Sequence, residues 1–169
     1  MNRQECIVFF NLPVKYNYCY LLLLLNGKQI FHEEIKTSMA VRAETKRILI
    51  VDDEPTILLT LSYALRSKDV EVITASRLEP AEEALSRYHF DLVIVDVRMS
   101  GVLGIEGLEL LTYIKRNWPE TEVIVMTAHG SEEMEKDTYE RGAKYYYTKP
   151  VDIDDLFQKV RSLGIPVKR

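Results

Sequence analysis

The sequence predicts an α/β fold in which five parallel strands form one doubly wound sheet with helices on both faces. From Lys46 onward, short apolar runs alternate with segments whose apolar residues recur at helical spacing. This alternation is typical of βα units. In addition, a run such as Leu92–Val95 is apolar at every position, as a central parallel strand is when helices cover both faces of the sheet. Counting the units gives a (βα)5 arrangement.

Each expected strand is a short run of mainly apolar or aromatic residues. The five strands are predicted at Ile48–Val51, Val70–Thr74, Leu92–Val95, Val123–Met126 and Lys144–Tyr147.

Helices are expected after each strand. The first begins at Pro55, because proline suits the first helical position, and the third stops before Pro119. The last is capped by Asp152. Apolar residues at helical spacing mark four of them: Ile57, Leu58, Leu61, Ala64 and Leu65 in the first, Ala81, Ala84 and Leu85 in the second, Leu108, Leu111 and Ile114 in the third, and Ile153, Leu156, Phe157 and Val160 in the last.

The fourth helix, expected over Ser131–Arg141, has a different composition. Its sequence is SEEMEKDTYER, and Met134 is its only clearly apolar anchor. A helix with so little apolar surface should be weakly docked on the sheet and comparatively easy to shift.

Composition and charge exclude some classes of function. The 169 residues are 47% hydrophobic and 28% charged, which suits a globular protein with a substantial core. A formal net charge of −4 argues against direct nucleic-acid binding, which requires a basic face. The two cysteines, Cys6 and Cys19, cannot build a disulfide framework or a cysteine metal site. The composition suits the reducing cytoplasm.

Residues 1–45 are interpreted as an N-terminal extension and residues 46–169 as the domain. The apolar run at 16–25 is ten residues long, well below the roughly 20 needed to span a bilayer, so membrane insertion is not expected. The Asn26-Gly27 pair between two apolar-rich segments favours a β-hairpin. Disorder, or a native start at Met39 that leaves residues 1–38 outside the working protein, are the alternatives.

Polar side chains follow four of the five expected strands, at the edge where open parallel sheets bind ligands. They are Asp52 and Asp53, Asp96, Thr127, and Lys149. Three nearby carboxylates raise one another's pKa unless a cation is present, and Mg²⁺ prefers carboxylate, water and phosphate oxygens. A lysine and a hydroxyl would serve the remaining oxygens of a phosphoryl group. The constellation predicts a phosphoryl-transfer site with an aspartate nucleophile.

Residues 46–165 resemble the receiver domain of bacterial two-component response regulators, the CheY-like superfamily with its flavodoxin-like fold. The motifs that carry the resemblance are, in order, ILIVDDEP, DLVIVDVRM, VIVMTA and KYYYTKP. The resemblance implies that Asp96 is the phosphoacceptor and Lys149 the phosphate-binding lysine. It also implies Mg²⁺ as cofactor, ligated by Asp53, Asp96 and the backbone carbonyl of Arg98, with Asp52 acting through a water molecule.

The same resemblance implies a conformational switch. Thr127 is the switch hydroxyl, Tyr146 matches the aromatic switch position, and the bond before Pro150 is expected to be cis. A phosphoryl group adds nearly two negative charges to a small cleft. Thr127 would then move toward it, Tyr146 would turn inward, and the weakly anchored helix at 131–141 would respond.

The expected partners follow from this function. The phosphoryl donor is a sensor histidine kinase, and the recipient of the signal is a downstream protein or a phosphotransfer protein. A homodimer through the face of the fourth helix is a further expectation. The last helix ends near Leu163, so the chain is expected to be a stand-alone receiver without an output domain.

Two departures from the family pattern lie in the loop after Asp96. Ser100 stands where the family usually has proline, which removes a fixed φ angle. If Gly107 marks the start of the third helix, the loop has about three extra residues; if Gly104 does, the helix is longer instead.

Two other functions remain open at this stage. An aspartyl phosphatase of the haloacid-dehalogenase type also uses aspartate and Mg²⁺, but it needs a DxD pair after the first strand, whereas Asp52 and Asp53 are adjacent. A degenerate receiver could act only as a binding module, although the complete acceptor set counts against this. Glu54 is interpreted as favourable charge at a helix start.

Overall fold

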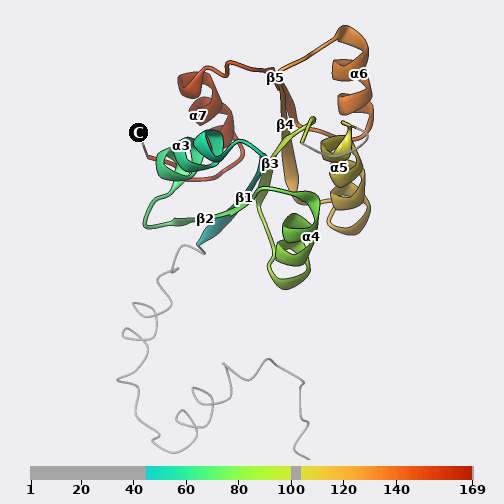
Figure 1. Cartoon of the computed structure of the whole chain (residues 1–169). Coiled ribbons are helices and arrows are strands. Elements are labelled where there is room, and N and C mark those ends of the chain that lie inside the picture. The colour runs from blue at the N-terminus through green and yellow to red at the C-terminus, as the bar shows by residue number, and fades with distance from the viewer. Residues whose placement is uncertain (1–44, 100–103, 169) are drawn as a thin grey trace, which may run out of the picture. The chain divides into compact units, whose positions relative to one another are not determined.

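A computed structural model, which describes residues 45–99 and 104–168, confirms the expected α/β fold (Figure 1). Its five parallel strands are in the order β2-β1-β3-β4-β5. The strands are β1 (Lys46–Val51), β2 (Val70–Ala75), β3 (Leu92–Asp96), β4 (Glu122–Thr127) and β5 (Tyr145–Thr148). The helices are α3 (Pro55–Leu65), α4 (Leu78–Arg87), α5 (Glu106–Asn117), α6 (Glu132–Glu140) and α7 (Ile153–Ser162).

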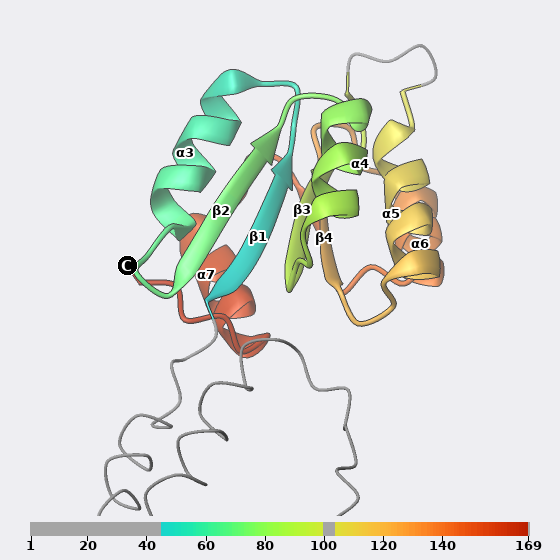
Figure 2. The same cartoon turned by 90° about the horizontal axis from the view of Figure 1, so that it is seen from below.

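Helices cover both faces of the sheet, and each face has its own apolar core (Figure 2). Alternate residues of β1, such as Leu49 and Ile50, belong to the two different cores because successive side chains of a strand point to opposite faces. One core is completed by α4 and α5 and the other by α3 and α7. The continuously apolar strands of the sequence are therefore buried on both sides, as predicted.

The start of helix α5 lies in close contact with the end of strand β3. A Cβ atom on Gly107 would lie 2.0 Å from the carbonyl oxygen of Asp96, so this glycine lets the start of α5 approach the end of β3. Helix α5 begins at Glu106, which agrees with the alignment at Gly107 rather than with a longer helix from Gly104. Ser100 and its neighbours to residue 103 lie outside the described residues.

Helix α6 runs from Glu132 to Glu140, one residue shorter at each end than the predicted Ser131–Arg141. Ser131 and Arg141 are its two cap residues, and Met134 is only partly buried against the core. The fully buried residue of the helix is Thr138, which the prediction of Met134 as anchor overlooked.

Strand β5 spans Tyr145–Thr148, one residue later in the chain than the predicted Lys144–Tyr147. The expectations for the N-terminal extension, including the hairpin, fall on residues outside those described. Within the described residues, no helix is long and apolar enough to cross a membrane.

Candidate functional site

The order of the strands brings Asp52 and Asp96 together. Strands β1 and β3 are neighbours, with Val51 paired to Val95, so the residue that follows each of these positions stands at the same edge of the sheet. Both carboxylates are buried, at 0% and 4% exposure of the residue. A buried carboxylate requires a compensating partner.

Lys149 supplies that partner from the segment after β5. Its Nζ atom donates to Asp52 Oδ2 at 2.8 Å and to Asp96 Oδ2 at 2.9 Å. The backbone of Lys149 is held in place because its N–H donates to the carbonyl oxygen of Thr127 at 2.8 Å. The Lys149–Pro150 peptide bond is cis. The carboxylates that follow β1 and end β3 thus meet around the ammonium group of Lys149, while the end of β4 holds the backbone of this lysine.

The surroundings favour the charged form of Lys149 and disfavour the charged form of Asp96. Burial lowers the pKa of Lys149, but the hydrogen bonds and charges of Asp52 and Asp96 outweigh this and raise the pKa of Lys149 above its ordinary value. Burial raises the pKa of Asp96, and the hydrogen bond from Lys149 offsets that rise only in part. The site therefore keeps Lys149 charged next to Asp96, whose carboxylate is costly to ionise without a cation.

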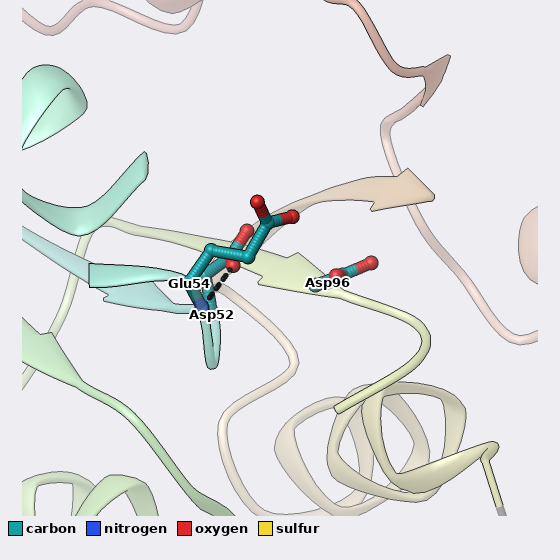
Figure 3. Close-up of side chains that lie close together, drawn as sticks. All are labelled: Asp52, Glu54 and Asp96. Carbon is teal, nitrogen blue, oxygen red and sulfur yellow. Dashed lines mark hydrogen bonds between the residues drawn. The ribbon is translucent and has the colours of Figure 1, made fainter. Parts of the chain in front are cut away.

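Glu54 completes the group of acids (Figure 3). Carboxylate oxygens of Asp52, Glu54 and Asp96 all lie within 4.8 Å of one another, and Glu54 Oε1 is 3.3 Å from Lys149 Nζ. The sequence interpretation of Glu54 as helix-start charge is incomplete, since it is the N-cap residue of α3 but its side chain makes no capping hydrogen bond. Its carboxylate contacts Lys149 instead.

The carboxylates of Asp52, Glu54 and Asp96 suit a hard divalent cation. The donor set is made of carboxylate oxygens, which Mg²⁺ prefers. Asp53 is half-buried between Asp52 and Glu54 in the sequence, but it is not one of the three clustered acids. The predicted roles of Asp53 and of the Arg98 carbonyl as direct ligands stay predictions. The backbone N–H of Arg98 donates to Asp96 Oδ1 at 3.4 Å.

The two residues predicted to act as a switch, Thr127 and Tyr146, both have buried polar atoms. Thr127 is fully buried at the end of β4, and its Oγ1 accepts from the backbone N–H of His129 at 3.2 Å. Tyr146 is half-buried, packs against the α4–α5 core and has a buried hydroxyl. A Cβ atom on Gly130 would lie 2.7 Å from that hydroxyl oxygen.

Comparison with known proteins identifies the family. Residues 48–161 match the response regulator receiver domain. The chain belongs to the response regulator receiver family. The receiver resembles sporulation initiation phosphotransferase F of Bacillus subtilis, with 32% identity over 73% of this chain and 96% of that protein. It also resembles the alginate biosynthesis transcriptional regulatory protein AlgB of Pseudomonas aeruginosa, with 37% identity over 65% of this chain and 24% of that protein. The match spans about a quarter of the length of AlgB and similar transcriptional regulators.

A solved structure of similar fold was determined with ligands bound. The response regulator protein TrrA of Thermotoga maritima, in complex with Mg²⁺ and beryllofluoride, has a TM-score of 0.61 and 34% identity, and the alignment covers 70% of this chain and 98% of that one. The acidic cluster of the receiver is consistent with a Mg²⁺ site of this kind.

Family membership also excludes one of the two alternatives left open by the sequence. The chain carries a receiver domain, and receivers are a class of signalling phosphoacceptors rather than classical enzymes. The alternative of a haloacid-dehalogenase phosphatase is therefore wrong.

Proposed function

We propose that this receiver accepts a phosphoryl group on Asp96 from the phosphohistidine of a sensor histidine kinase. A carboxylate oxygen of Asp96 attacks phosphorus, the N–P bond breaks, and the kinase imidazole leaves as the neutral ring once it takes up a proton. The observation that carries the proposal is the position of Lys149, whose Nζ lies 2.9 Å from Asp96 Oδ2. A cation fixed at that point can stabilise the charge that develops on the phosphoryl oxygens.

Each remaining residue has a part in this proposal. Mg²⁺, when held by Asp53, Asp96, the Arg98 carbonyl and, through water, Asp52, would screen the charges of the acids and the phosphoryl oxygens. The Asp52 carboxylate orients Lys149 through its 2.8 Å contact. The hydroxyl of Thr127 would donate to a phosphoryl oxygen, in exchange for its present contact with the His129 amide.

The output of the proposed reaction is a change in the face formed by α6 and β5. Motion of Thr127 pulls on the loop before α6, and Gly130 of this loop lies against the hydroxyl of Tyr146. The partners proposed for this face are a downstream protein, a phosphotransfer protein or a second copy of the chain. A cytoplasmic location is part of the same proposal.

Phosphorylation by acetyl phosphate with Mg²⁺ tests the reaction without knowledge of the kinase. The expected product is one adduct per chain that survives acid and is removed by hydroxylamine, as an acyl phosphate is. Asp96→Asn should abolish it, and a chelator should prevent its formation. Asp69→Asn is the matched control, because Asp69 precedes β2 at the opposite edge of the sheet and should leave the yield unchanged.

The degenerate receiver is the second candidate, and the same experiment separates the two. A wild-type chain that forms no adduct with either acetyl phosphate or a panel of histidine kinases, yet stays folded, would contradict phosphoryl transfer and favour a binding module.

A further inference from the structure

Glu54 is the charged group of the site to which the proposed function assigns no part. It stands between Asp53 and the first residue of α3. Its backbone N–H donates to Asp52 Oδ1 at 2.9 Å, which joins it to the site (Figure 3). Its side chain is 55% exposed, in contrast to the buried Asp52 and Asp96.

The three acids occupy the full donor capacity of Lys149. An ammonium group has three N–H donors, and Nζ has carboxylate oxygens at 2.8, 2.9 and 3.3 Å, from Asp52, Asp96 and Glu54 respectively. A phosphoryl oxygen that approaches Asp96 can bond to this ammonium only if one of the carboxylates releases it.

Glu54 is the partner that can release Lys149 at the lowest cost. Its contact is the longest of the three, and its exposed carboxylate can be rehydrated as it leaves. Release by a buried carboxylate would strand a charge away from water, which is much more costly. Asp96 must in any case remain at the reacting point.

We propose that Glu54 is a positioning residue that holds Lys149 among the carboxylates and yields it to an incoming phosphoryl group. Its negative charge also favours a divalent cation in the site and disfavours a free anion. The inference rests on the proposed function, because it assigns a role around the same acceptor. It goes beyond that function by making Glu54 the residue that sets the balance between cation and anion binding.

Loss of the Glu54 charge should change the affinities for the two ligands in opposite directions. Glu54→Gln removes one negative charge beside the cation site, so Mg²⁺ should bind more weakly. The same change frees one donor of Lys149 and reduces repulsion, so an anion should bind more tightly. A merely structural role of Glu54 at the start of α3 would instead weaken the binding of both ligands.

The experiment measures two dissociation constants by isothermal titration calorimetry on the whole chain, one for Mg²⁺ and one for beryllofluoride at saturating Mg²⁺. For Glu54→Gln we expect Mg²⁺ binding about three- to tenfold weaker and beryllofluoride binding about three- to tenfold tighter, the size expected for one charge beside a partly screened site. Glu79→Gln is the matched control, since Glu79 is an exposed acid in the first turn of α4. It should change either constant by less than about twofold.

The outcomes separate this inference from the proposed function. Equal constants for Glu54→Gln and Glu79→Gln, or a change of both ligands in the same direction, would overturn the role of Glu54 while leaving Asp96 as acceptor. A wild-type chain that binds neither ligand, or binds beryllofluoride equally well as Asp96→Asn, would overturn the proposed function and the inference with it.

Discussion

Helices α3 and α6 pack on the same sheet but are held there by different forces. Helix α3 has the sequence PTILLTLSYAL, without a charged residue, and it buries Leu61 and Leu65. Helix α6 has the sequence EEMEKDTYE and buries Thr138 alone. Apolar burial contributes roughly 25 cal/mol per Å² of surface removed from water, so α3 should be bound to the sheet far more firmly than α6.

Polar contacts replace the missing apolar surface in α6. The Ser131 side chain accepts from the backbone N–H of Met134 at 3.1 Å. Arg141 donates to Asp137 Oδ1 at 2.9 Å and to Thr112 Oγ1 of α5 at 3.0 Å. Such exposed contacts contribute little each and can be exchanged for water. Helix α6, which follows Thr127 and precedes Tyr146, should therefore cost less to move than α3.

The largest expected effect is the loss of an apolar anchor of α3. Leu65→Ala should lower the free energy of unfolding by about 2–5 kcal/mol, because Leu65 is fully buried and its removal leaves a cavity. Urea denaturation measures this change. Leu59→Ala on the same helix is the control, since Leu59 is 71% exposed and should change stability by less than about 0.5 kcal/mol. Similar losses for both variants would contradict the assignment of α3 as an apolar anchor.

The next effect concerns the space between the loop before α6 and Tyr146. Gly130→Ala places a methyl group where the hydroxyl oxygens of Tyr146 and Thr148 lie 2.7 Å away. We expect a cost of about 1–3 kcal/mol, and we expect the ring of Tyr146 to turn outward. A fluorine label on the tyrosines, read by NMR, would show the shift. An unchanged Tyr146 signal would show that the loop moves instead of the ring.

A smaller effect is expected at the cap of α6. Ser131→Ala removes the acceptor for the Met134 amide and should cost about 1 kcal/mol. Because α6 has so few apolar contacts, the loss should appear as faster hydrogen exchange within α6 and not within α3. Ser131→Asp keeps an acceptor at this position and should restore slow exchange. Faster exchange spread evenly over both helices would contradict the independent opening of α6.

The smallest expected effect is a difference in pH-dependent stability between two adjacent tyrosines of β5, Tyr146 and Tyr147, which pack on opposite faces of the sheet. Tyr147 lies on the α3–α7 face, where burial and its 2.6 Å hydrogen bond to Asp155 raise its pKa. A raised folded pKa favours the protonated ring, so this stabilisation is complete below the ordinary value of 10.0 and is lost as the pH rises through the folded pKa.

Above pH 10 the free energy of unfolding should therefore fall less steeply with pH in Tyr147→Phe than in the wild type. The difference in slope should be at most about 1 kcal/mol per pH unit. Urea midpoints measured between pH 8 and about 11 test this. The matched variant on the other face, Tyr146→Phe, keeps Tyr147 and should retain the wild-type slope more closely. Equal slopes for Tyr147→Phe and the wild type would contradict a shifted tyrosine at this position.

Much of the fold and of the site was predictable because it depends on repeating local patterns. The period of apolar residues marked the strands and helices, and the polar residue after each strand belonged to one edge because parallel strands share their direction. This reasoning placed Asp52, Asp53, Asp96, Thr127 and Lys149 together, although Asp53 is not one of the three clustered acids of the described residues. The one-residue shift of β5 was not predictable, since Tyr145–Thr148 is a short edge strand whose bounds depend on its pairing with β4.

The acidic edge of the sheet and the polar character of α6 could be predicted from the sequence, because both follow from residue type and spacing. The contact of Glu54 with Lys149 and the burial of the Tyr146 hydroxyl depend on the fold. Glu54 and Lys149 are separated by 95 residues. They come into contact because the fold brings the segment after β5 next to the segment after β1. The local sequence marks Glu54 only as a charge at a helix start, whereas the fold brings the ammonium group of Lys149 within 3.3 Å of its carboxylate.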